Sequence, residues 1–402
     1  MADRAQREAA PTSPATLDVG SQASPSTTAL EAGVLGSPHS GFINASDPGL
    51  VLHPDLALGL LMRRLYPERL FVGWLLYADE NDGASRVRAL IPHIHLRRLG
   101  VNSVILRKPR IPWAPFQPSD RSLQRIVEAG LDVLIFQGVT GMKAEALAQA
   151  LRNTSTKTVY VTGDLVKSGM PTAVDWVVVG SQRLQDVARP FPEKTSVIEG
   201  VLEVPAGLAK DYRQPRQHQP LKVVWVGYPE NLHLLAPIKE ALQDPRLRDY
   251  QLVTISRGPE ATLQWDRKRV WSDLLDCDIA VLPSAPADWY QAKPNTRMVM
   301  LKALGLPLIA SPIDSYRATL THGESCYFAE TVQQWADCLA RLGDAEHRRA
   351  IGLTDRDRIV DLHSVQAIGA RWLSLLTDLT ERTISPREPW PNRRAPFAHS
   401  AT

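Results

Sequence analysis

Short apolar segments alternate with segments of helical periodicity through most of this chain, and this alternation constrains its fold more than any other feature. Segments such as 70–77 and 133–136 are nearly continuous apolar runs of strand length, whereas 87–94 carries apolar residues at the spacing of one helix face. Strands that are apolar at every position are buried on both faces, which is typical of a parallel sheet covered by helices. The predicted strands of this half are 70–77, 103–106, 133–136, 158–162, 176–179 and 196–198. Its predicted helices are one from residue 87 to near Gly100, a good helix stop, and those over 123–129, 143–151 and 184–188.

A polar stretch over residues 210–220 interrupts the alternation, which restarts at residue 221. The strands predicted beyond it are 221–226, 252–255, 279–282 and 308–310, and the helices are 232–242, 270–275, 298–304, 332–342 and 364–379. The pattern therefore predicts an α/β protein with two doubly wound, Rossmann-like units. Ligands of such sheets bind beyond the carboxyl ends of the strands, so the cleft between two units is the expected site.

Both ends of the chain are rich in Ala, Ser, Thr, Pro and Gly and carry few apolar residues, too few to offset the entropy lost on ordering. The alternative, that a tail docks on a partner, stays open. The predicted organisation is a flexible N-terminal tail and lead-in over 1–67, an N-terminal Rossmann-like domain over 68–205, a linker over 206–220, a C-terminal Rossmann-like domain over 221–362, a C-terminal helix over 363–382 and a flexible tail over 383–402.

Composition excludes several classes of protein. There are 46 basic and 43 acidic residues, and this net charge of +3 argues against a dedicated nucleic-acid binder, which would carry a strong basic excess. Three scattered cysteines are too few for a disulfide framework or a zinc site, which favours a reducing compartment. No apolar run reaches the roughly 18 residues that a transmembrane helix needs, and the N-terminus does not resemble a secretory signal. We therefore expect a cytoplasmic protein.

The clearest chemical signal lies around residue 295, where a helix is predicted to begin. Lys293 and Arg297 flank this helix start, so two cations, free backbone amides and the helix dipole would all favour a bound diphosphate. The alternative is a solvated helix start with two surface cations. Gly227, which follows the strand 221–226, would let the backbone approach a ligand, or it is part of an ordinary strand-to-helix turn.

Segment 278–316 resembles the nucleotide-sugar-binding part of GT-B glycosyltransferases, in particular the large "group 1" family of retaining enzymes. The resemblance rests on Asp278, Ile279 and Pro283, then on Gly305, Leu306, Pro307, Ile309, Ala310 and Ser311, and in the first half on Ala84, Ser85, Arg86, Val87 and Arg88 with Leu99 and Gly100. It covers roughly residues 70–380. It implies two Rossmann-like domains facing a cleft, a donor held by the second domain, an acceptor held by the first, and a final helix that crosses back to the first domain.

The resemblance also suggests which residues bind substrate. Lys293 and Arg297 would hold the diphosphate, and Ser85 and Arg86 would lie on the acceptor side. The remaining predicted donor-binding residues are Gly227, Tyr228, Asn231, Tyr290, Asn295 and Thr296, of which Asn295 and Thr296 would supply the helix start. No catalytic residue is predicted. The nucleotide sugar is a substrate, so no cofactor is expected, and without an Asp-x-Asp pair at a strand end no metal site is expected either.

The chain departs from the family at one informative position. The family commonly carries two glutamates seven residues apart, the second seven positions before the proline of Gly-Leu-Pro, and Met300 stands there. A branch with Lys-x-Asn-x-Arg instead matches Lys293, Asn295 and Arg297. Either phosphate binding has moved to these cations, or sugar turnover has been lost.

Two functions follow as hypotheses. The first is a glycosyltransferase that moves a sugar from a nucleoside diphosphate donor to a saccharide, lipid-linked or other small acceptor, with retention implied by the resemblance. The second is a GT-B-shaped binding or scaffold protein without turnover. Peripheral contact with a membrane stays open, and a nucleic-acid partner is not expected. A dehydrogenase is disfavoured, because neither unit carries the glycine fingerprint of a dinucleotide site.

Overall fold

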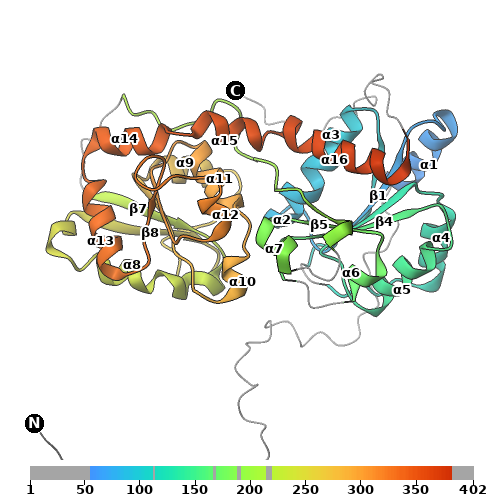
Figure 1. Ribbon diagram of the computed structural model, residues 1–402, viewed down its shortest axis with the longest axis horizontal. Coiled ribbons are helices and arrows are strands. Elements are labelled where there is room, and N and C mark those ends of the chain that lie inside the picture. Colours follow the sequence, from blue (N-terminus) through green and yellow to red (C-terminus); the bar gives the residue numbers. More distant parts are fainter. Residues whose placement is uncertain (1–54, 112–113, 166–168, 188–191, 214–219, 383–402) are drawn as a thin grey trace, which may run out of the picture. The chain divides into compact units, whose positions relative to one another are not determined.

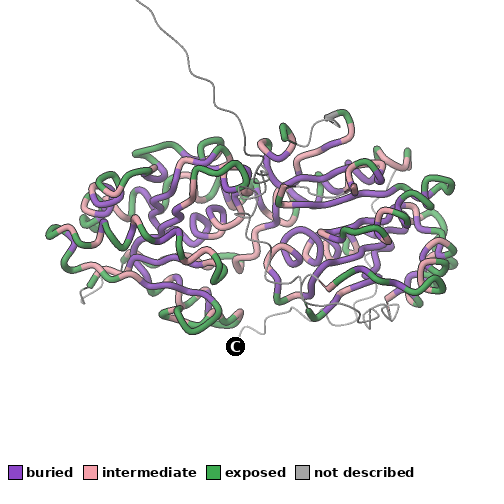
Figure 2. Tube along the Cα trace, turned by 90° about the horizontal axis from the view of Figure 1, so that it is seen from below, coloured by how far each residue is buried: buried purple, intermediate pink, exposed green. Residues whose placement is uncertain are grey.

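Two six-stranded parallel sheets, each with helices on both faces, form the framework of the computed structural model (Figure 1). The structure describes residues 55–111, 114–165, 169–187, 192–213 and 220–382, and all of them belong to one unit, Ser46–Thr402. The strands of both sheets are buried along most of their length, and exposure is concentrated on loops and outer helix faces (Figure 2). The predicted fold class is therefore confirmed.

The first sheet has the strand order β2-β1-β3-β4-β5-β6, and every neighbouring pair is parallel. Its order reverses between β1 and β3, which is the topological switch point of this sheet. The strands are β1 Phe71–Leu76, β2 Asn102–Arg107, β3 Val133–Gln137, β4 Lys157–Thr162, β5 Trp176–Val179 and β6 Thr195–Val197. All six lie where the apolar runs predict strands.

Successive side chains of these strands alternate between two buried layers. Phe71 and Leu75 of β1 pack on one face with Ile126 of α4, whereas Val72 and Trp74 pack on the other. The helical segments of this half are α1 Asp55–Leu65, α2 Gly83–Ser85, the π-helix η1 Arg86–Leu90, α3 Ile91–Arg98, α4 Asp120–Glu128, α5 Met142–Leu151, α6 Met170–Ala173, α7 Gln182–Val187 and the 3₁₀ turn η2 Pro192–Lys194.

The second sheet has the order β12-β11-β10-β7-β8-β9, again parallel throughout. Counted from its own first strand this is the dinucleotide-fold order 3-2-1-4-5-6, with the switch point between β7 and β10. The strands are β7 Leu221–Val226, β8 Tyr250–Ser256, β9 Leu263–Gln264, β10 Ile279–Leu282, β11 Leu308–Ala310 and β12 Tyr327–Phe328. Its helical segments are η3 Pro229–Leu235, α8 Ala236–Ala241, η4 Pro245–Leu247, α9 Val270–Leu275, α10 Asp288–Gln291, α11 Thr296–Ala303, α12 Asp314–Arg317, α13 Val332–Arg341, α14 Ala345–Leu353 and α15 Arg356–Leu362.

The last helix, α16 Val365–Thr380, packs on the first sheet rather than on the second. Ser364 caps it, accepting a hydrogen bond from the backbone N–H of Ala367 at 3.1 Å. Trp372 meets Trp74 of β1 edge to face, with ring centroids 5.3 Å apart. The C-terminal helix thus buries an apolar stripe on the far half of the chain, as the resemblance implies. The predicted domain boundaries themselves stay predictions.

Several elements differ from the sequence-based expectation, among them the short strands β9 and β12, which the apolar pattern does not predict. Helix α1, which begins at Asp55, lies within the segment predicted as tail and lead-in. The helix predicted over 232–242 is a 3₁₀ segment as far as Leu235 and an α-helix only from Ala236 onwards. Residues 1–54 of the predicted tail and lead-in over 1–67, the predicted tail over 383–402 and part of the linker lie outside the described residues.

Lys302 of α11 is fully buried in the second half. Its ammonium group donates to three backbone carbonyls, those of Ile351 at 2.6 Å, Ser325 at 2.9 Å and Gly352 at 3.1 Å. It therefore ties α11 to α14 and to the loop before β12, and its charge is satisfied without a carboxylate.

Replacing this lysine should be costly. We expect Lys302→Met to lower the free energy of unfolding by about 3 kcal/mol, because it leaves several buried carbonyls without a donor. Lys239→Met, on the exposed face of α8, is the matched control and should stay within about 0.5 kcal/mol of the parent. Urea unfolding measures both, and equal stability of the two variants would contradict this role for Lys302.

Candidate functional site

The switch point of the second sheet carries a glycine and an arginine in close contact. Gly227 directly follows β7, and a Cβ there would lie 2.5 Å from the Trp225 ring and 3.0 Å from Nη1 of Arg297. The half-buried Arg297 side chain donates to the carbonyl of Val226 at 3.4 Å, which is a long hydrogen bond. A glycine at the strand end thus makes room for a guanidinium group at the edge where Rossmann-like sheets bind ligands.

The start of α11 lies beside this arginine. Asn295 is the N-cap residue, but its side chain does not cap the helix. Its Nδ2 instead donates to Oε1 of Glu199 at 2.6 Å, and its Oδ1 is buried without a hydrogen-bond partner. The sequence places the helix start correctly, but Asn295 contributes to it through its backbone and directs its side chain to the loop after β6. The first amides of α11 therefore have no side-chain cap from this residue.

Lys293, the second predicted diphosphate ligand, is engaged by a carboxylate. Its ammonium group forms an ion pair with Asp164, in the loop after β4, and lies 4.9 Å from the centroid of the Trp289 ring. Asp164 comes two residues after the end of β4, and its carboxylate contacts Lys293 directly. The charge of the lysine is thus compensated from within the chain.

The predicted aromatic residues also have protein partners. The hydroxyl of Tyr228 donates to Oδ1 of Asp82 at 2.9 Å. Tyr290 is buried, stacks on Trp289 with ring centroids 3.5 Å apart, and its hydroxyl is 3.1 Å from Nε2 of His233. Tyr290 therefore forms part of a small aromatic cluster. Asn231 lies in η3, where its backbone N–H donates to the carbonyl of Tyr228, and no side-chain interaction singles it out.

The two predicted acceptor-side residues are both fixed by carboxylates or amides. The backbone N–H of Ser85 donates to Oδ2 of Asp82 at 2.7 Å, and its hydroxyl is 3.3 Å from Oε1 of Gln137. Arg86 binds Glu203 through two hydrogen bonds, at 2.6 and 3.0 Å. Burial alone would lower the pKa of this arginine, but its bonds to Glu203 hold the pKa above the usual value. Arg86 therefore forms a buried ion pair with Glu203.

Three carboxylates in loops of the first half bind side chains of the second half. Asp82 accepts a hydrogen bond from Tyr228, and Glu199 accepts one from Asn295. Asp164 forms an ion pair with Lys293. Asp82 and Glu199 carried no usable signal, because each lies in an irregular loop more than ninety residues away in sequence from its partner. A ligand entering this edge would have to exchange with these bonds, since they occupy the side chains predicted to hold it.

Glu199 also faces two further basic groups, Arg371 at 3.4 Å and His363 at 3.9 Å. Burial lowers the pKa of His363, so the imidazole is neutral at physiological pH and Arg371 supplies the compensating charge.

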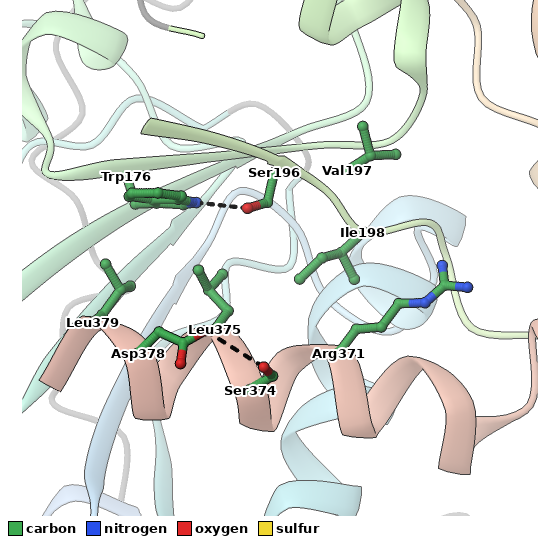
Figure 3. Close-up of a pocket in the computed structure, with 9 residues that line it drawn as sticks. All are labelled: Trp176, Ser196, Val197, Ile198, Arg371, Ser374, Leu375, Asp378 and Leu379. Atoms are coloured by element: carbon green, nitrogen blue, oxygen red, sulfur yellow. Dashed lines mark hydrogen bonds between the residues drawn. The ribbon is translucent and has the colours of Figure 1, made fainter. Parts of the chain in front are cut away.

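A cavity of about 520 Å³ lies elsewhere, along the edge strand β6 under α16 (Figure 3). It is lined by Trp176, Ser196, Val197, Ile198, Arg371, Ser374, Leu375, Asp378 and Leu379. None of the predicted site residues lines it, and it is not at the switch point of either sheet. Within the described ranges, we find no cluster of three metal-ligating side chains and no helix long and apolar enough to cross a membrane.

Several solved structures share this architecture. A structure of HepE from Anabaena in complex with UDP and glucose superposes with a TM-score of 0.59 at 14% identity, over 77% of this chain and 100% of that chain. Sucrose-phosphate synthase from Thermosynechococcus elongatus superposes with a TM-score of 0.60 at 14% identity, over 78% of this chain and 100% of that chain. A glycosyltransferase from Rickettsia africae superposes with a TM-score of 0.56 at 13% identity, over 78% of this chain and 100% of that chain. The fold is therefore GT-B, as the sequence predicts. No protein-family model and no curated protein sequence matches this chain.

The close packing at Gly227 gives a direct test of this geometry. Gly227→Ala should destabilise the protein by about 1–3 kcal/mol, because the added methyl group collides with the buried Trp225 ring. Gly83→Ala is a matched control, since a Cβ at Gly83 meets nothing closer than 3.8 Å. Thermal denaturation of both variants measures the difference, and an unchanged melting temperature for Gly227→Ala would show that this strand end is open.

Proposed function

We propose that this protein is a glycosyltransferase that transfers a sugar from a nucleoside diphosphate donor to an acceptor hydroxyl group. The observation that carries the proposal is the guanidinium of Arg297 over Gly227, beside the uncapped start of α11, at the switch point of the second sheet. A cation, free amides and a helix N-terminus at this point form an arrangement suited to a diphosphate. Lys293 would add a second cation once it leaves Asp164.

The comparisons support the choice of donor class. The HepE structures that share this fold contain UDP, UDP with glucose, and UDP-glucose. We therefore propose a UDP-sugar as donor and a saccharide, a lipid-linked sugar or another small molecule as acceptor. Similarity of the sequence to retaining enzymes suggests that the anomeric configuration is kept, which the NMR spectrum of the product would reveal.

The proposed reaction asks little covalent chemistry of the protein. The bond between the anomeric carbon and the diphosphate oxygen breaks, a bond to the acceptor oxygen forms, and the proton of the acceptor hydroxyl passes to the departing diphosphate. Negative charge grows on the departing diphosphate, so fixed cations and amides around it lower the barrier. Arg297 and Lys293 would provide this stabilisation, with Thr296 contributing its backbone amide.

Removing either cation should weaken donor binding. We expect Lys293→Ala and Arg297→Ala each to raise the Kd for UDP roughly 10-fold to 100-fold, since a charge-assisted hydrogen bond is worth about 1.5–3 kcal/mol. Lys239→Ala, on the exposed face of α8, should leave it unchanged. Calorimetric titration of UDP measures all three, and unchanged affinity in both site variants would rule out this diphosphate site.

The ion pair between Lys293 and Asp164 makes a prediction of the opposite sign. Because the carboxylate competes with the diphosphate for the ammonium group, Asp164→Asn should lower the Kd for UDP several-fold. In a Lys293→Ala background the same substitution should have no effect on the Kd. The double-mutant cycle contradicts the proposed competition if Asp164→Asn acts equally in both backgrounds.

A second candidate function is nucleotide-sugar binding without turnover. It is favoured by one observation: Met300, at the position of the family's second glutamate, packs against the apolar core of the second half and offers no polar group to a sugar. Incubation with UDP-glucose and a panel of acceptors distinguishes the two. Release of UDP at a rate abolished by Arg297→Ala supports transfer, whereas tight binding with no release supports the binding function.

A further inference from the structure

Arg88 differs from every other deeply buried cation in the described part of the chain. Those side chains are Arg86, Arg107 and Lys302, besides Arg88 itself. Arg86 has the carboxylate of Glu203, and Arg107 and Lys302 each donate to three backbone carbonyls. To the described residues, Arg88 makes a single side-chain hydrogen bond, to the carbonyl of Thr162 at 3.3 Å.

The fold makes room for this guanidinium at a specific place. Gly163 follows β4 and Gly180 follows β5, two neighbouring strands of the first sheet. A Cβ on Gly163 would lie 2.6 Å from Cζ of Arg88, and one on Gly180 would collide with Nη1. The charged group therefore sits over the carboxyl ends of two parallel strands, the edge at which α/β sheets bind ligands. Arg88 reaches it from the π-helix η1, a type of irregularity that is frequent at functional sites.

In the described part of the chain, no carboxylate forms an ion pair with this group. No carboxylate of the described residues lies within 4.0 Å of its nitrogens, and the acids that act on it at longer range include Asp164, Asp82 and Glu199. Each of these is already bonded to Lys293, Tyr228 or Asn295. Burial lowers the pKa of Arg88, but an arginine stays charged at physiological pH. A buried charge without a partner is costly, and five N–H donors in a planar fork match an oxyanion.

We infer that Arg88 binds an anionic group, a phosphate or a carboxylate, on the acceptor. This inference rests on the proposed function, which places the donor diphosphate at Arg297 and Lys293 on the second sheet and leaves the first sheet for the acceptor. The acceptors are then anionic small molecules rather than neutral sugars. Ser181 and Asp164 directly follow the two glycines that contact Arg88. Ser181 donates to the carbonyl of Ala292, and Asp164 pairs with Lys293. Donor binding that draws Lys293 away would therefore open the path to Arg88.

Inorganic phosphate is the simplest probe. The full chain is first saturated with UDP, so that the diphosphate site is filled, and phosphate is then titrated while its Kd and the melting temperature are followed. Phosphate should stabilise the parent protein, and Arg88→Met should weaken its binding at least about 10-fold. Arg88→Lys should fall between them, because a point charge cannot bind an oxyanion in a bidentate manner. Arg121→Met, on the exposed face of α4, should behave as the parent does.

A purely structural role for Arg88 predicts something else. If the guanidinium only ties β4 to η1, Arg88→Met lowers the melting temperature and leaves phosphate binding of the folded protein unchanged, which overturns the inference. Removal of an uncompensated buried charge should instead leave the melting temperature equal or higher. Gly180→Ala, which displaces the guanidinium while keeping the arginine, should also weaken phosphate binding.

The remaining arms separate the sources of the anion. The Kd values of glucose 6-phosphate, glucuronate and glucose, each measured with UDP bound, show whether the site prefers a phosphate or a carboxylate. Tighter binding of glucose than of either anion contradicts the inference. Loss of UDP affinity in Arg88→Met would assign the anion to the donor and overturn the acceptor assignment. If the parent protein does not bind UDP, the proposed function fails, and the phosphate titration without UDP then tests Arg88 alone.

Discussion

Burial of both faces of each parallel sheet is the constraint on which the rest of this structure depends. Strands such as β1 and β7 send alternate apolar side chains into two layers, so helices must cover both faces. Even the final helix, α16, is used in this way, since Trp372 completes the layer that holds Trp74. With the faces closed, polar chemistry is confined to the strand ends, and the loops after β4, β6, β7 and β10 carry the residues that matter for function.

The buried and half-buried cations of this structure are satisfied to different degrees. Lys302 and Arg86 are satisfied by carbonyls and by a carboxylate, and they hold the framework together. Lys293 has a partner, Asp164, that we propose a diphosphate replaces. Among the described residues, Arg88 has a single long bond to a carbonyl and Arg297 has another. This gradation from satisfied to unsatisfied cations separates the structural groups from those proposed to bind substrate.

Much of the fold could be predicted because a buried strand is recognisable from a short run of consecutive apolar residues. Runs such as 133–136 and 279–282 are apolar at every position, and they coincide with β3 and β10. Helix α1 was missed because it lies in a segment predicted as tail and lead-in, although an aspartate such as Asp55 is favourable in the first turn of a helix. The change from 3₁₀ to α geometry at Ala236 depends on local hydrogen bonding that periodicity does not report.

The candidate site was only partly predictable. Lys293 and Arg297 could be found because both flank a helix start that the apolar pattern locates. Their partners could not, since Asp164 and Val226 come from loops or strands far away in the chain. Arg88 lies inside the segment that carries the resemblance, but its burial depends on contact with Gly163 and Gly180. The spacing of these three residues in the sequence does not predict that contact.

The most direct test of this account is a crystal structure of the full chain with UDP bound. It predicts the diphosphate within hydrogen-bond distance of the Arg297 guanidinium and of the first amides of α11, with Lys293 released from Asp164 and turned to the phosphate oxygens. UDP bound away from the switch point of the second sheet, or bound there with the ion pair between Lys293 and Asp164 intact, would contradict it.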